Sequence, residues 1–167
     1  MNTQQLLQVI NSDHFIKTKC GGVCALNELP SQVVPDTFFI CNTDPSWLQG
    51  KHWIVMYFAI DGKAEYFDSF GSFPKEKIIE NFLDKNSTCW SCNNVQLQGT
   101  FSNTCGEFCL LYVLYRLRGF YMPTVISMFK KDCNENDVLV YTYIRKKYPF
   151  VFNTAKKSGQ TSIPMYV

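Results

Sequence analysis

The chain lacks any apolar run of the about 20 residues that a membrane-spanning helix needs. Its first five residues, Met1-Asn2-Thr3-Gln4-Gln5, lack the positive charge and the apolar stretch of a secretory signal peptide. These absences predict an intracellular protein with no membrane association. In a reducing compartment the eight cysteines are expected to be thiols rather than a disulfide framework.

Charged residues are also scarce. They make up 18% of the chain and leave a net charge of +2, which does not by itself indicate a nucleic-acid-binding protein. Four short basic clusters are interpreted as solvated surface: Lys17/Lys19, Lys130/Lys131, Arg145/Lys146/Lys147 and Lys156/Lys157. Because 46% of the 167 residues are hydrophobic, the length and composition predict one domain over residues 1–167.

Histidine is nearly absent, with two in the chain, so few groups can act as a base near neutral pH. One of them, His52, lies upstream of a segment in which Gln98 precedes Cys105 by seven residues. An apolar run follows Cys105 and predicts a buried helix that begins at this cysteine. The partial positive charge of a helix start favours a thiolate over a thiol. The adjacent Gly106 is expected to leave room for a substrate.

Four side chains together predict nucleophilic acyl transfer. Cys105 is the candidate nucleophile, and His52 would take the thiol proton and later protonate the leaving amine. Asp68 would accept the second ring N–H of the histidine and fix its tautomer. Gln98 would donate its amide to the oxyanion, beside the backbone N–H of Cys105.

The pattern of elements predicts an α+β fold with a central mixed sheet, a buried helix beginning at the catalytic cysteine and further C-terminal helices. Residues 12–35 are expected to be irregular. The expected strands are 37–41, 52–60, 64–70 and 94–98, and the expected helices are 3–10, 75–85, 105–118, 123–131 and 136–147. The strand over 52–60 is apolar on both faces and should be covered on both sides. Ile78, Ile79, Phe82 and Leu83 are expected on the inner face of the helix over 75–85.

The length of the turn between the expected strands 52–60 and 64–70 determines whether Asp68 lies on the same face of the sheet as His52. A two-residue Asp61-Gly62 loop would place Asp68 on the sheet face opposite His52. A three-residue loop over 60–62, with Gly62 in a left-handed bulge, would pair Ile54 with Asp68 and put the carboxylate on the same face as the histidine. The catalytic interpretation requires the bulged loop, which we predict.

Other residues allow more than one interpretation. Gly21-Gly22, Trp47 and Phe70-Gly71 are candidates for the cleft walls or for ordinary turns and packing, and Trp53 could serve the cleft or the core. Cys109 should point into the core. A rival constellation of Cys89, Cys92, Cys105 and Cys109 has the spacing of a four-thiolate zinc site.

The candidate site residues lie in motifs that resemble the adenovirus protease (adenain) family and, more distantly, the Ulp-type SUMO proteases. The motifs that carry the resemblance are Gly50–Trp53, Tyr66–Gly71, Val95–Gly99 and Asn103–Cys109. The resemblance implies a papain-like cysteine peptidase in which His52, Asp68, Gln98 and Cys105 are the catalytic residues. Adenain has a glutamate in place of Asp68, and the Ulp-type enzymes have an aspartate.

The resemblance implies an endopeptidase that cleaves viral or virus-like precursor proteins, after glycine, as a monomer in the host nucleus or the virion. It implies no cofactor for the chemistry, although relatives use DNA and a viral peptide as activators. A ubiquitin-like or SUMO-type isopeptidase with the same catalytic residues is the first alternative. A zinc-stabilised interaction module without catalysis is the second.

Overall fold

A computed structural model describes residues 1–152, and the Lys156/Lys157 cluster lies outside this range. The helices and strands follow one another along the chain in the order α1 (Thr3–Ser12), α2 (His14–Lys17), β1 (Cys20–Ala25), η1 (Leu26–Glu28), β2 (Thr37–Asn42), β3 (Trp53–Phe58), β4 (Lys63–Phe67), α3 (Lys77–Asn86), β5 (Cys89–Cys92), α4 (Cys105–Arg116), α5 (Met122–Ser127), α6 (Cys133–Lys147) and η2 (Pro149–Val151). Over residues 1–152, no helix is long and apolar enough to cross a membrane.

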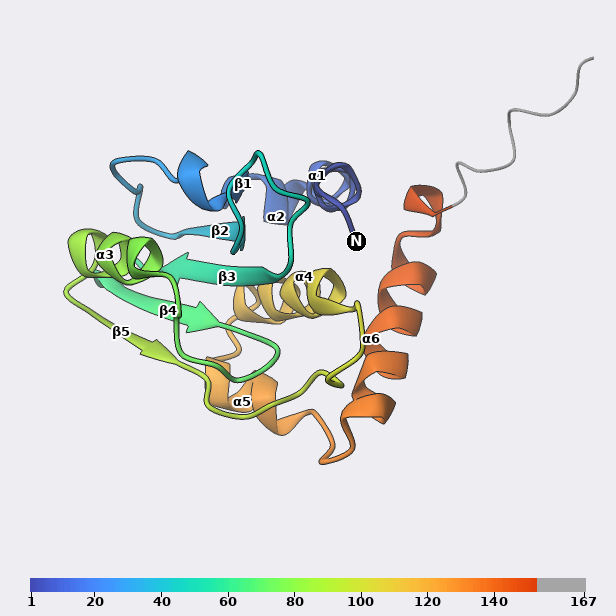
Figure 1. Ribbon diagram of the computed structural model, residues 1–167. Helices are drawn as coiled ribbons and strands as arrows, with labels where there is room; N and C mark the ends of the chain where they lie inside the picture. The colour runs from blue at the N-terminus through green and yellow to red at the C-terminus, as the bar shows by residue number, and fades with distance from the viewer. Residues whose placement is uncertain (153–167) are drawn as a thin grey trace, which may run out of the picture.

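The five strands form one mixed sheet in the order β1-β2-β3-β4-β5 (Figure 1). The central pairs β2–β3 and β3–β4 are antiparallel, whereas each edge strand is parallel to its neighbour. Helix α3 makes the crossover from β4 to the parallel strand β5, because parallel neighbours cannot be joined by a tight hairpin. The predicted α+β fold with a central mixed sheet is confirmed.

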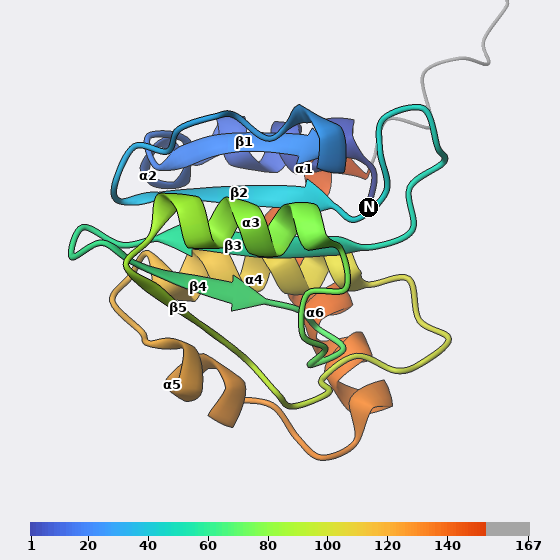
Figure 2. The ribbon, with the colours of Figure 1, turned by 60° about the vertical axis from the view of Figure 1, so that its left-hand side comes forward.

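Helices cover both faces of the sheet, with α3 in front of it and α4 behind it in Figure 2. Alternate residues of β3 therefore enter two different cores: Trp53, Val55 and Tyr57 pack with α4, and Ile54, Met56 and Phe58 pack with α3. All six are buried, as predicted for a strand covered on both sides. Helix α4 begins at Cys105 and is buried through Leu114, so the core itself fixes where the cysteine lies.

The β3–β4 hairpin has the predicted bulged turn. The Ala59 N–H donates to the Lys63 carbonyl at 2.8 Å, and the Gly62 N–H donates to the Ala59 carbonyl at 3.1 Å. Gly62 has a φ of +83°, in the left-handed region that glycine adopts without strain. The ladder continues through Val55 opposite Phe67. Extending it by one residue brings Asp68 opposite Ile54, on the same face as His52.

Several predictions of elements were wrong. Residues 12–35 are not irregular throughout, since they contain α2, β1 and η1. Gly21-Gly22 forms part of β1 rather than a turn. Residues 94–98 form no strand, and the strand after α3 is β5, four residues that carry two cysteines and little apolar alternation. Helix α5 ends at Ser127 instead of Lys131. On α3, Ile78 is exposed and only the other three predicted residues face inward.

Candidate active site

His52 and Asp68 meet at the end of the sheet where β3 begins. The ring Nε2 of His52 lies 2.6 Å from Asp68 Oδ1. The His52 side chain is 15% exposed and that of Asp68 is 6% exposed, so the pair is largely shielded from water but reachable from one side. The same Oδ1 accepts the Phe70 N–H at 2.8 Å, which fixes the carboxylate. With Nε2 held by Asp68, Nδ1 is the ring nitrogen left for a second partner.

Cys105 approaches this ring from the helix on the other side of the sheet, and its interaction with His52 contributes to the pKa of both groups. It is the first residue of α4 and is 9% exposed. It lines a cavity of about 360 Å³ together with His52, Gln98 and Trp53. The chain therefore brings the four predicted side chains, which are far apart in sequence, to one site.

The electrostatics of the pair favour an ionised thiol. Burial acts to raise the pKa of Cys105, but hydrogen bonds from His52 and from the Trp53 backbone N–H, together with the charge of His52, bring that pKa below its ordinary value. Burial acts to lower the pKa of His52, yet hydrogen bonds to Asp68 and Cys105 and their charges raise it to about 9. Opposite shifts of this kind favour a thiolate–imidazolium pair.

Gln98 is fixed so that one amide hydrogen stays available. Its Oε1 accepts the Ser69 hydroxyl at 2.6 Å, and its Nε2 donates to the Ser102 carbonyl at 2.8 Å. The side-chain amide carries two hydrogens, and among residues 1–152 the second has no acceptor. The N–H of Cys105 belongs to the first turn of α4, whose donors have no partner within the helix. The two groups are the donors that an oxyanion hole needs.

Asn93, for which the sequence predicted no role, holds the turn that carries Asp68. Its side chain is 2% exposed; Oδ1 accepts the Asp68 N–H at 2.8 Å and Nδ2 donates to the Asp68 carbonyl at 2.6 Å. The Ser69 carbonyl, in the same turn, accepts the backbone N–H groups of Leu97 and Gln98. One turn thus positions both the carboxylate and the amide of the site. The wrong strand prediction over 94–98 concealed this role.

Two neighbouring residues of α6 hold the segment between Gln98 and Cys105, and both were also missed. Asp137 accepts the Gly99 N–H at 3.1 Å and the Thr104 hydroxyl at 2.6 Å, so one carboxylate bridges the ends of the segment. Asn136 is fully buried and donates to the Leu97 carbonyl at 3.1 Å. A signal for Asn136 was present, because it lies on the same helical face as the apolar Val140 and Ile144.

The cleft walls differ in part from the predictions. Trp53 belongs to both the core and the cavity: it is 7% exposed, lines the space around Cys105, and its indole N–H donates to the Met1 carbonyl at 3.0 Å. The centroid of the Phe70 ring lies 4.9 Å from that of the His52 ring, and Phe70 lines the same cavity. Trp47 is 74% exposed, on the loop before His52.

The expectation for Gly106 is corrected, and of the two interpretations of Gly21 the structure favours packing. A Cβ at Gly106 would lie 2.9 Å from Met1 Cβ and 3.6 Å from the Leu6 side chain, so this glycine allows the N-terminal segment to pack closely on α4 rather than making room for a substrate. A Cβ at Gly21 would lie 2.4 Å from the Phe39 ring. Gly21 therefore serves packing within the sheet and does not form a cleft wall.

The zinc interpretation is not supported by the fold. Cys105 and Cys109 lie on α4, whereas Cys89 and Cys92 lie on the edge strand β5. Within residues 1–152, no group of three or more cysteine, histidine or acidic side chains is placed to hold a metal ion. Cys109 is fully buried, as predicted, and burial raises the pKa of its thiol well above the ordinary value.

If Gln98 donates to the oxyanion of a cysteine peptidase, replacing it with alanine should lower kcat for peptide hydrolysis by about 10²- to 10³-fold. Steady-state kinetics should show the loss mainly in kcat. Alkylation of Cys105 by iodoacetamide, which forms no oxyanion, should continue at a comparable rate. Gln32→Ala, in an exposed loop, is the matched control. Equal kcat values for the two variants would contradict the assigned role of Gln98.

No protein-family model matches the sequence, and no curated protein matches it. Among solved structures, the central domain of the uncharacterized Lpg1148 protein from Legionella pneumophila aligns with a TM-score of 0.51 and 13% identity, over 90% of this chain and 98% of that domain. Because the identity is low, this likeness establishes the fold and not an activity.

Two further structures align less closely. The ASFV pS273R protease has a TM-score of 0.46 and 24% identity, over 60% of this chain and 39% of that protein. The Chlamydia trachomatis effector protein Cdu1, solved bound to ubiquitin, has a TM-score of 0.46 and 16% identity, over 62% of this chain and 49% of that one. The aligned part of the chain thus spans less than half the length of either protein.

Proposed function

We propose that the protein is a cysteine endopeptidase in which Cys105 is the nucleophile, His52 the base, Asp68 the group that orients the base, and Gln98 an oxyanion donor. The observation that carries the proposal is the position of one imidazole: it is hydrogen-bonded at 2.6 Å to a buried carboxylate and lies against a thiol at the start of a buried helix. The shifts in the pKa of both partners favour the reactive ion pair.

In the proposed reaction, the Cys105 thiolate attacks the carbonyl carbon of the scissile bond, and the oxygen takes the negative charge between the Cys105 N–H and Gln98 Nε2. The His52 imidazolium gives its proton to the leaving amine as the C–N bond breaks, which leaves a thioester on Cys105. His52 then takes a proton from water, and the resulting hydroxide attacks the thioester. The products are a carboxylic acid, the thiolate and a protonated His52, ready for another cycle.

The walls of the cavity support a small residue on the acyl side of the cleaved bond. Trp53, Met1 and Gln98 line the space beside Cys105, and Gln98 and Trp53 are nearly buried and fixed by hydrogen bonds. We propose that polypeptide substrates are cleaved after glycine, with viral or virus-like precursors as the class that the sequence resemblance implies. Activation by DNA or by a viral peptide is proposed on that resemblance alone.

The test uses fluorogenic peptides that differ only in the residue before the cleaved bond. The glycine peptide should be hydrolysed at least about tenfold faster, in kcat/KM, than the leucine peptide, since a bulky side chain cannot fit the fixed walls. Propargyl-amide probes of ubiquitin and SUMO, applied in parallel, would label Cys105 rapidly if the protein were instead an isopeptidase of ubiquitin-like proteins. Failure to hydrolyse any of the peptides, with or without DNA, would contradict the endopeptidase proposal.

A further inference from the structure

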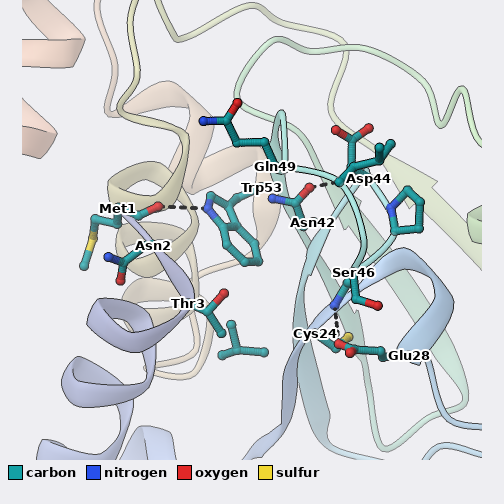
Figure 3. Close-up of a pocket in the computed structure, with 15 residues that line it drawn as sticks. Met1, Asn2, Thr3, Cys24, Glu28, Asn42, Asp44, Ser46, Gln49 and Trp53 are labelled. Carbon is teal, nitrogen blue, oxygen red and sulfur yellow. Dashed lines mark hydrogen bonds between the residues drawn. The ribbon is translucent and has the colours of Figure 1, made fainter.

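Figure 3 shows a second cavity, of about 400 Å³, which shares part of its wall with the cavity that holds Cys105. It lies between the N-terminal part of α1, the ends of β1 and β2, and the loop that leads to His52. The two cavities share Met1, Asn42, Gly50 and Trp53 in their walls. A polypeptide that occupies the first cavity can therefore extend directly into the second.

Asn42, in the shared wall, presents an unused hydrogen-bond donor. It is the last residue of β2 and is 8% exposed. Its Oδ1 accepts the Asp44 N–H at 2.9 Å, which fixes the amide plane, whereas Nδ2 has no acceptor among residues 1–152. Figure 3 shows the Asn42 amide directed into the cavity, toward the space between Trp53 and Gln49. Because Asn42 lines both cavities and this donor has no partner within the described residues, the donor is free to bind an acceptor on a ligand.

Gly50 keeps the space in front of this donor open. Its φ is +85°, and a Cβ at this position would lie 2.8 Å from Asn42 Nδ2. Any side chain would therefore be strained and would also contact the amide. The donor stays accessible because this position has no side chain.

The charged side chains that line the cavity are acidic, and the α-ammonium of Met1, which also lines it, lies 3.7 Å from Glu107 Oε2. Glu28 and Asp44 line it, and no lysine, arginine or histidine side chain does so among residues 1–152. Glu28 Oε2 accepts the Ala25 N–H at 2.9 Å, and Asp44 Oδ1 lies 3.6 Å from Lys51 Nζ. The Lys51 side chain is 80% exposed, so this ion pair is weak and screened by water. With the Met1 ammonium beside Glu107 and Lys51 largely in solvent, the Glu28 and Asp44 carboxylates are the side-chain charges in the cavity wall that a cationic group could meet.

We propose that this cavity is a substrate subsite that binds a lysine or arginine side chain, while Asn42 Nδ2 donates to a backbone carbonyl of the same polypeptide segment. The inference rests on the proposed peptidase function, because the segment would be the part of the substrate that flanks the cleaved bond. Asn42 would contact the backbone of any peptide. Glu28 and Asp44 would select peptides that carry a basic side chain at this position.

The selectivity test uses the glycine peptide with lysine, norleucine or glutamate placed in turn at each of the three positions on either side of the cleaved bond. At one of these positions, kcat/KM for the lysine peptide should be about tenfold higher than for the glutamate peptide. In the double variant Glu28→Gln/Asp44→Asn, the ratio should fall to about two or less, since both charges are lost while the Ala25 N–H keeps its acceptor. Asp61→Asn, on the exposed β3–β4 turn, is the matched control and should keep the ratio. Equal rates for the three peptides at all positions would overturn the subsite.

The role of Asn42 is tested with the norleucine peptide, so that the charge of the substrate does not contribute. Asn42→Asp keeps the oxygen that accepts the Asp44 N–H and removes the donor. We expect KM to rise by about tenfold with a smaller change in kcat. An unchanged KM would overturn the assignment of the donor.

Binding to the Cys105→Ala variant separates this inference from the proposed function. Fluorescence anisotropy with labelled peptides should give a Kd about tenfold lower for the lysine peptide than for the glutamate peptide. If the wild-type protein hydrolyses nothing while this preference is present, the peptidase proposal fails and the subsite stands. If the wild type hydrolyses the glycine peptide but neither rates nor Kd values depend on lysine, the subsite fails and the peptidase proposal stands.

Discussion

Cys105→Ala should reduce kcat/KM for the glycine peptide by about 10³-fold or more, the largest effect expected of any single substitution. Among residues 1–152, Cys105 is the one cysteine that lines the cavity around His52 and Gln98. Cys109 lies one turn further along α4 but is fully buried, and burial raises the pKa of its thiol. The expected cost in unfolding free energy is about 1 kcal/mol, because one sulfur atom at the edge of a cavity is lost. Peptide kinetics and thermal unfolding, run in parallel, measure the two effects.

Cys89→Ala is the control for this variant. Cys89 is exposed on the edge strand β5, so its loss should leave both kcat/KM and the melting temperature nearly unchanged. If Cys105→Ala kept a tenth or more of the wild-type activity, the thiol would not be the nucleophile. Equal loss of activity in both variants would indicate a structural role for the cysteines.

His52→Gln is expected to have the second largest effect, a loss of about 10³-fold in kcat/KM. Glutamine can keep a hydrogen bond to Asp68, but it cannot take the thiol proton or give one to the leaving amine. It also carries no positive charge, so a cause of the lowered Cys105 pKa is removed. The measurement is steady-state hydrolysis of the glycine peptide at neutral pH, with the folded state verified by circular dichroism.

His14→Gln provides the matched control, because His14 is the other histidine of the chain and lies exposed on α2. Its kcat/KM should stay within about twofold of the wild type, as is usual for surface substitutions. Comparable losses in the two histidine variants would show that neither acts as a specific base.

The site was largely predictable because each of its residues carries a local signal. Gln98 and Cys105 lie in one short segment that ends in an apolar helix. His52 and Asp68 flank a hairpin whose glycine-containing turn limits the register to two choices. Because successive side chains of a strand point to opposite faces of the sheet, only one of these registers places Asp68 on the same face as His52. The observed bulge at Gly62 is the one that the chemistry requires.

The residues that hold the site in place could not be predicted in the same way. Asn93 and Asp137 act through hydrogen bonds to backbone groups that lie 25 and 38 positions away, and no periodicity marks such pairs. Strand β5 was missed because its stability comes from pairing with β4 and packing under α3 rather than from its own four residues. The donor of Asn42 is likewise visible only once β2 and the loop to His52 are placed together.

The pH dependence of Cys105 alkylation by iodoacetamide tests the central claim most directly, because it reports the ionisation of the thiol without requiring a substrate. A lowered Cys105 pKa and a His52 pKa raised to about 9 mean that the ion pair exists between these two values. The wild-type rate should therefore have its inflection below pH 8.5, the ordinary pKa of a thiol, and His52→Gln should move the inflection upward. A wild-type inflection at or above about 8.5 that His52→Gln does not move would contradict the account.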